Sequence, residues 1–129
     1  MENNLFKYQH RKYEEEIEKW INEKENTVLL ISGVRQCGKS RIVNELLTKN
    51  NISYFEINFV RDLKEKERML SINNVGEMIT FFKTNSKTPL KKGESIIFLD
   101  EIQEASALIT MIKFLKKKEV FVIYSVGLF

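Results

Sequence analysis

One short stretch holds the residue types and spacing best suited to chemistry. It runs Gly33-Val34-Arg35-Gln36-Cys37-Gly38-Lys39-Ser40 and fits the pattern G-x-x-x-x-G-K-[ST] at every fixed position. Its two glycines permit backbone torsions and a close approach that a Cβ would prevent. The N–H groups of such a loop can surround an anion, and a helix that begins near Lys39 adds unpaired N–H groups and the positive end of its dipole. The stretch therefore predicts a polyphosphate site.

Each polar side chain of this loop has a predicted role. Lys39 would neutralise the β- and γ-phosphates as a point charge, and the hydroxyl of Ser40 would bind a Mg²⁺ ion that bridges them. Most of the remaining contacts would come from the backbone. The predicted cofactor-binding residues are Gly33, Val34, Arg35, Gln36, Cys37, Gly38, Lys39, Ser40 and Arg41.

A pair of acids forms the second candidate group. Asp100 ends the apolar run in Ser95–Asp100, and Glu101 follows it directly. At the carboxyl edge of a parallel sheet, Asp100 would lie near the phosphate loop and hold Mg²⁺ through water or through Ser40. Glu101 would polarise a water for attack on the γ-phosphate. A single acid at a strand end is commonly a helix N-cap or part of a solvated turn, but the pair favours catalysis.

Alternating strands and helices must position these groups. Apolar or alternating runs predict strands, and apolar residues at helical spacing predict helices between them. This order predicts an α/β fold of three layers around a parallel sheet with right-handed crossovers. We expect an N-terminal helical segment over 1–26 that packs on a core over 27–129. The predicted strands are 27–32, 52–59, 95–100 and 119–126, and the predicted helices are 14–24, 39–50, 61–70, 75–83 and 105–115.

Composition narrows the class of protein. The 129 residues suffice for one domain or part of one, and 43% hydrophobic with 30% charged residues is ordinary for a soluble globular chain. A net charge of +3 is too small to indicate nucleic-acid binding by itself. The single cysteine excludes an internal disulfide, and the lone His10 cannot build a metal site. No apolar run reaches the roughly 18 residues of a membrane span, and the N-terminus lacks the apolar region of a secretory signal. We therefore expect a cytoplasmic protein without membrane contact.

Together the two motifs resemble the Walker A and Walker B motifs of AAA-type ATPases within the P-loop NTPases. The similarity is closest to a prokaryotic branch with G-x-R-Q-x-G-K and D-E-I-Q, patterns that Arg35 to Lys39 and residues 100–103 fit. Arg11, Tyr13 and Trp20 also resemble the N-terminal helix of that branch. The resemblance covers nearly the whole chain, although only the two nucleotide motifs are highly specific.

This resemblance implies the strand order 5-1-4-3-2, with the fifth strand missing here and 1-4-3-2 remaining. It also implies ATP rather than GTP as the nucleotide, with Mg²⁺. A polar residue at the end of the fourth strand would sense the γ-phosphate and contribute to catalysis, and Ser125 is the candidate. The branch usually carries Thr-Gly-Ser there, whereas this chain reads Tyr-Ser-Val-Gly. A polar residue that simply leaves a strand is an equally good interpretation.

The chain ends at Phe129, before a fifth strand, a lid or an arginine finger of this family could occur. We therefore expect a fragment of a longer ATPase whose hydrolysis is weak, because an arginine finger accelerates turnover by roughly 10³ to 10⁵. The strand over 27–32 would become a sheet edge with unpaired backbone groups. Two interactions stay open as alternatives: a DNA or protein partner bound by the missing C-terminal region, and oligomers of the full-length protein.

The expected function is ATP binding and Mg²⁺-dependent ATP hydrolysis. Lys39 would stabilise the developing charge, Ser40 and Asp100 would hold the metal, and Glu101 would orient water. Two alternatives remain open. One is a nucleotide-switched module that binds ATP without hydrolysing it and presents a surface to protein or DNA. The other is a P-loop small-molecule kinase, which would not need Glu101 and would need an acceptor pocket and a lid.

Overall fold

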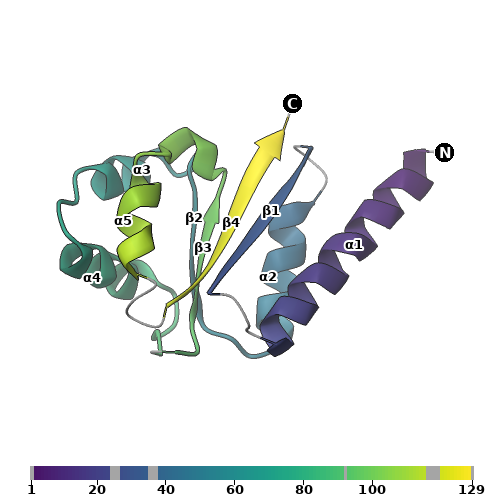
Figure 1. The fold of residues 1–129 in the computed structure, drawn as a ribbon, viewed down its shortest axis with the longest axis horizontal. Coiled ribbons are helices and arrows are strands. Elements are labelled where there is room, and N and C mark those ends of the chain that lie inside the picture. Colours follow the sequence, from purple (N-terminus) through teal and green to yellow (C-terminus); the bar gives the residue numbers. More distant parts are fainter. Residues whose placement is uncertain (1, 24–26, 35–37, 92, 116–119, 129) are drawn as a thin grey trace.

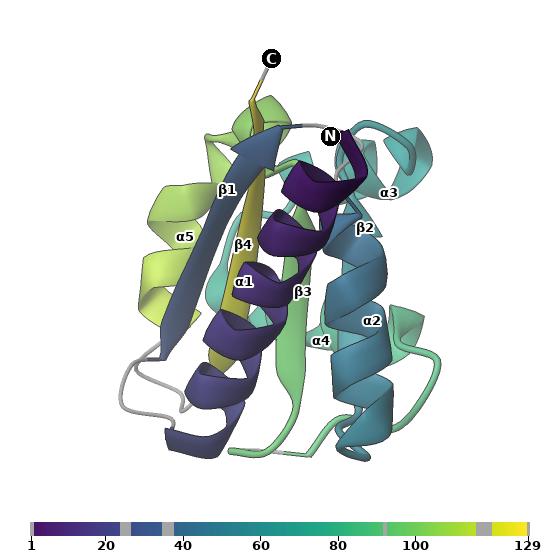
Figure 2. The same cartoon turned by 90° about the vertical axis from the view of Figure 1, so that its right-hand side faces the viewer.

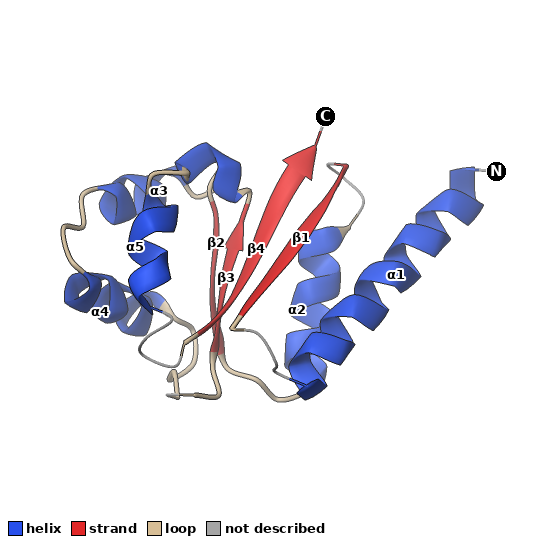
Figure 3. Cartoon of the chain, in the orientation of Figure 1, coloured by secondary structure: helices blue, strands red, loops and turns tan. Residues whose placement is uncertain are grey.

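The chain folds around one parallel sheet. The computed structural model describes residues 2–23, 27–34, 38–91, 93–115 and 120–128. Figure 3 shows helices on both sides of the central strands. In chain order the elements are α1 (Glu2–Glu23), β1 (Val28–Val34), α2 (Lys39–Lys49), β2 (Tyr54–Asn58), α3 (Leu63–Leu70), α4 (Val75–Asn85), β3 (Ile96–Asp100), the 3₁₀ turn η1 (Ile102–Ala105), α5 (Leu108–Leu115) and β4 (Phe121–Leu128).

The sheet has four parallel strands in the order β1-β4-β3-β2. This confirms the predicted α/β class and the order 1-4-3-2. The carboxyl ends of the strands lie together at the top of Figure 1, where α2 and η1 begin. Asp100 is in register with Asn58 on one side and with Ser125 on the other. The topology therefore brings polar residues of three strands to one edge.

Two apolar clusters hold the layers together. Successive residues of β3 point to opposite faces, so Ile96 and Phe98 pack with α1 and α2 while Ile97 and Leu99 pack with the other helices. Figures 1 and 2 show α1 and α2 on one side of the sheet and α3, α4 and α5 on the other. Both faces of β3 are buried, which explains why its sequence is continuously apolar.

The first helix is longer than the predicted 14–24, because α1 begins at Glu2. The apolar spacing of Tyr13, Ile17, Trp20 and Ile21 marks the part of the helix whose side chains pack against α2 and the sheet. The residues before them contain neither glycine nor proline, so nothing in the sequence stops the helix earlier.

The predicted helix over 105–115 is wrong at its start. The chain forms η1 first and begins α5 only at Leu108. Ile102, Ala105 and Leu108 are all buried and lie three residues apart, a spacing that suits a 3₁₀ turn, whereas Ile112 lies four residues further on.

The ends of two strands also differ from the predicted ones. Strand β2 is shorter than 52–59, and β4 begins at Phe121 and extends to Leu128. In the described part of the chain, no helix combines the length and apolar character of a membrane span.

Candidate functional site

Gly38 directly precedes α2, which contains Lys39 and Ser40 at the end of the predicted phosphate loop (residues 33–40), whereas Gly33 and Val34 at its beginning lie in β1. Its φ of 83° and ψ of 17° are left-handed torsions that glycine adopts without strain. The first helical bond runs from the N–H of Ile42 to the carbonyl of Gly38, at 3.0 Å. Because the first N–H groups of a helix have no partner within it, the start of α2 offers donors to an anion. Arg35, Gln36 and Cys37, predicted to bind the cofactor, lie outside the described residues.

Lys39 is buried, with 6% of its surface exposed. Its Nζ donates to the carbonyl oxygen of Val126 at 2.6 Å. Val126 belongs to β4, which pairs with β1 on one side and β3 on the other. The ammonium group therefore lies at the carboxyl end of the sheet, and α2 and β4 are linked through it.

Ser40 and Asp100 meet although they are 60 positions apart in the sequence. The Ser40 hydroxyl donates to Oδ2 of Asp100, a carboxylate with 2% of its surface exposed. Asn58 at the end of β2 donates from Nδ2 to the same oxygen at 3.2 Å, and its own Oδ1 accepts the backbone N–H groups of Val60 and Arg61. Sequence reasoning placed Asn58 in a strand and missed this contact. The signal was available, because Asn58 is a polar residue near the end of a strand, as Asp100 is.

Glu101 directly follows β3 and has left-handed torsions, φ 58° and ψ 43°, which are uncommon for a residue other than glycine. Only 9% of its surface is exposed. Gln103 donates from Nε2 to Oε2 of Glu101 at 2.6 Å and accepts the N–H of Gly127 at 3.4 Å. Gln103 was noted in the sequence only as part of a motif, and no spacing rule assigns it this bridging position.

Ser125 lies in β4, in register with Ile31 and Asp100, and is fully buried. Among the described residues its Oγ has no hydrogen-bond partner. The neighbouring Tyr124 hydroxyl also has none within the described part, and burial raises the pKa of Tyr124 to about 12. Arg41, another predicted cofactor contact, is exposed and pairs with Glu45 at 2.8 Å along α2.

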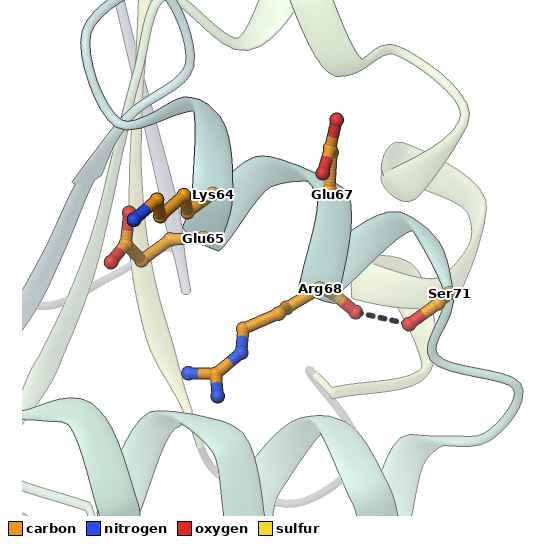
Figure 4. A pocket seen from close by; sticks show the side chains of 5 residues that line it. All are labelled: Lys64, Glu65, Glu67, Arg68 and Ser71. Carbon is orange, nitrogen blue, oxygen red and sulfur yellow. Dashed lines mark hydrogen bonds between the residues drawn. The ribbon is translucent and has the colours of Figure 1, made fainter.

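Two hollows have linings that include none of Lys39, Ser40 and Asp100. One of about 500 Å³ is on α3, and Figure 4 shows basic and acidic side chains around it, with Ser71 Oγ donating to the Arg68 carbonyl at 2.7 Å. Because this hollow is lined by both basic and acidic side chains, its charge favours neither an anionic nor a cationic ligand. The other, of about 370 Å³, includes Glu56 and the Arg61–Asp62 ion pair. Burial raises the pKa of Glu56, and hydrogen bonding to Arg61 lowers that of Asp62.

The described residues contain no group of three or more His, Cys, Asp and Glu side chains that could enclose a metal. The pair of Ser40 and Asp100 is different in kind, because it presents oxygen ligands from two elements at one point. Mg²⁺ commonly binds through one or two protein ligands and completes its shell with water and phosphate oxygens.

Comparison with known proteins identifies a family for this chain. No curated protein matches it. Residues 25–127 match the model of a family described as an AAA domain. The match confirms the resemblance to AAA-type P-loop ATPases at the level of the family and supports ATP binding, while the narrower prokaryotic branch stays a prediction. Since the matched residues make up most of the sequence, the chain belongs to the AAA domain family.

Proposed function

We propose that this protein binds ATP with Mg²⁺ and hydrolyses it at the carboxyl edge of the sheet. The observation that carries the proposal is the contact between Ser40 and Asp100, which joins the start of α2 to the end of β3. Lys39, the neighbour of Ser40, is held at the end of β4 by its bond to Val126. Two motifs far apart in the sequence thus converge on one point.

Phosphate binding would use the amides of the loop and the Lys39 ammonium. The bond from Nζ to the carbonyl of Val126 holds that buried ammonium at the carboxyl end of the sheet. A bound triphosphate would place negative charge beside it. The exposed Arg41 would contribute through its N–H in the first turn of the helix rather than through its paired side chain.

The donor set also fits a Mg²⁺ ion. A hydroxyl and a carboxylate are hard oxygen ligands, and Asn58 holds the Asp100 carboxylate in place. Ser40 and Asp100 would hold the metal, the former directly and the latter directly or through water. When bound, Mg²⁺ neutralises charge on the β- and γ-phosphates.

Two further residues would act on the reaction itself. The Glu101 carboxylate would accept a proton from the attacking water. The orphaned hydroxyl of Ser125 would donate to a γ-phosphate oxygen, which would give this buried group the partner that the described residues do not supply. The proposal includes both roles. It also includes an N-terminal helical segment over residues 1–26 that packs on a core over residues 27–129.

Binding and phosphate release measured on the same samples test the proposal. We expect the parent to bind MgATP in calorimetric titration and to release phosphate. Lys39→Ala should weaken binding at least about tenfold, because hydrogen bonds to charged groups contribute about 1.5–3 kcal/mol. Lys49→Ala is the matched control, since Lys49 ends the same helix and is exposed.

Glu101→Gln separates binding from hydrolysis. It should retain MgATP affinity and lose phosphate release. Equal affinity in Lys39→Ala and the parent would contradict the proposed site. Binding without phosphate release in both the parent and Glu101→Gln would favour the nucleotide-switched module instead.

A further inference from the structure

The amide of Gln103 bridges two parts of the candidate site. A backbone N–H can only donate, so the side-chain carbonyl of Gln103 must face Gly127. This orientation leaves the amino group to face Glu101, where Nε2 and Oε2 are 2.6 Å apart. The two bonds together determine which end of the amide meets the carboxylate.

Buried residues on both sides of Gln103 hold the backbone of η1 in place. Ile102 and Ala105 of η1 are buried, with 2% and 4% of their surfaces exposed. The N–H of Glu104 donates to the carbonyl of Glu101 at 3.1 Å and closes the turn. Gln103 therefore projects from an anchored turn, and its reach to Glu101 does not depend on a loose segment.

The far end of the bridge lies on β4. Gly127 follows Val126, whose carbonyl accepts the Lys39 ammonium, and lies two residues after Ser125. It is also in register with Gly33 at the start of the phosphate loop. One side chain thus connects the carboxylate after β3 with the strand that contacts the phosphate-binding lysine.

We propose that Gln103 is a positioning residue that holds the Glu101 carboxylate against the carboxyl end of β4. This inference rests on the proposed role of Glu101 in hydrolysis. Gln103 acts through Glu101 rather than on the nucleotide, so its loss lowers kcat and leaves the affinity for MgATP unchanged. Because the bond has a charged acceptor, we expect kcat to fall at least about tenfold.

Two substitutions test the bridge from different sides. Gln103→Met keeps the length of the side chain and removes both bonds. Gln103→Glu keeps an acceptor for Gly127 and removes the donor to Glu101. Both should lower kcat with the dissociation constant for MgATP within twofold of the parent. Ser106→Ala, at an exposed position just after η1, should leave both quantities unchanged.

The outcomes distinguish this inference from the proposed function. If Glu101→Gln abolishes phosphate release but both Gln103 variants turn over like the parent, the positioning role is wrong and the proposed function stands. If affinity falls together with kcat in both variants, Gln103 supports the whole site and the positioning role is also wrong. Absent phosphate release in the parent contradicts the proposed function itself.

An NMR measurement tests the hydrogen bond between Gln103 and Glu101 without requiring ATP hydrolysis. The side-chain NH₂ signals of Gln103, assigned as the pair lost in Gln103→Met, should shift in the ¹⁵N–¹H spectrum of Glu101→Gln. They should stay in place in Glu94→Gln, an exposed glutamate before β3. Unshifted signals in Glu101→Gln would overturn the bridge whether or not the protein hydrolyses ATP.

Discussion

At the scale of single residues, Ser125 combines complete burial with a hydroxyl that has no partner among the described residues. A buried donor without a partner costs about 1–3 kcal/mol of stability. The free protein thus carries a cost that a γ-phosphate oxygen would relieve, which is typical of a residue retained for binding rather than for folding.

Replacing Ser125 with alanine should therefore separate stability from function. We expect the free energy of unfolding of Ser125→Ala to be unchanged or raised by about 1 kcal/mol, and phosphate release to fall. Ser95→Ala is the control, because the Ser95 hydroxyl bonds to Ser53 at 2.5 Å and to the N–H of Lys91 at 2.6 Å. Denaturant unfolding of both variants checks this. Destabilisation of Ser125→Ala as large as that of Ser95→Ala would contradict it.

Glu56 should make stability depend on pH. Burial raises its pKa above the ordinary 4.5, against the lowering effect of Asn44 and Arg61. A carboxyl with a raised pKa in the folded state binds more protons folded than unfolded, so its contribution to stability falls as pH rises through 4.5 and above.

Glu56→Gln removes this titration. The difference in unfolding free energy between Glu56→Gln and the parent should therefore grow in favour of the variant as pH rises from 4 towards 7. Thermal unfolding across that range measures it. Glu94→Gln, which replaces an exposed glutamate, is measured as the control. A constant difference between Glu56→Gln and the parent would show that the raised pKa is absent in solution.

At the scale of elements, α1 supports the strand that leads into the phosphate loop. The Tyr13 hydroxyl donates to the carbonyl of Ser32 in β1 at 2.9 Å. Trp20 packs edge-on against Phe121 of β4, with ring centroids 6.1 Å apart. The helix thus contacts both strands that flank the candidate site, and its packing shares a core with α2.

Truncation of Ile17, which is fully buried in α1, tests that support. Ile17→Ala should lower the free energy of unfolding by about 2–5 kcal/mol in one cooperative transition, because the cavity would open in the shared core. Glu16→Ala, on the exposed side of the same helix, should change it by less than about 0.5 kcal/mol. Denaturation followed by both circular dichroism and Trp20 fluorescence checks this. Separate transitions by the two probes would mean that α1 unfolds independently of the core.

At the scale of the molecule, the sequence predicts the layers and strand order better than the contacts within the site. Continuous apolar runs and strict motif spacing predict β3 and the start of α2 at Lys39, because these depend on burial and backbone geometry, whereas β1 extends to Val34, two residues beyond the predicted 27–32. The order of the strands came from the family resemblance rather than from periodicity. Asn58 offered a signal as a polar residue near a strand end, but its pairing with Asp100 also depends on the register between the strands. The bridge of Gln103 offered no such signal, because it depends on the turn geometry after β3.

The arrangement of the sheet also has a consequence for solution behaviour. In the described part of the chain, β1 pairs only with β4, and Figure 2 shows it at the side of the sheet. Leu30 of this strand is 57% exposed, on the face opposite to the buried Ile31. An apolar strand at the edge of a sheet favours pairing with another copy.

Leu30→Glu should therefore reduce self-association, because a charge on an edge strand opposes pairing with a second copy. We expect the parent to show a weight-average sedimentation coefficient that rises with protein concentration, and Leu30→Glu to show a smaller rise. Val60→Glu is the matched control, since Val60 is 45% exposed but lies in the turn after β2 rather than in an edge strand. A parent that sediments as a monomer at every concentration, or an equal effect of both substitutions, would show that β1 does not pair with a second copy. Affinity for MgATP should be the same in both variants and the parent, because neither side chain belongs to the candidate site.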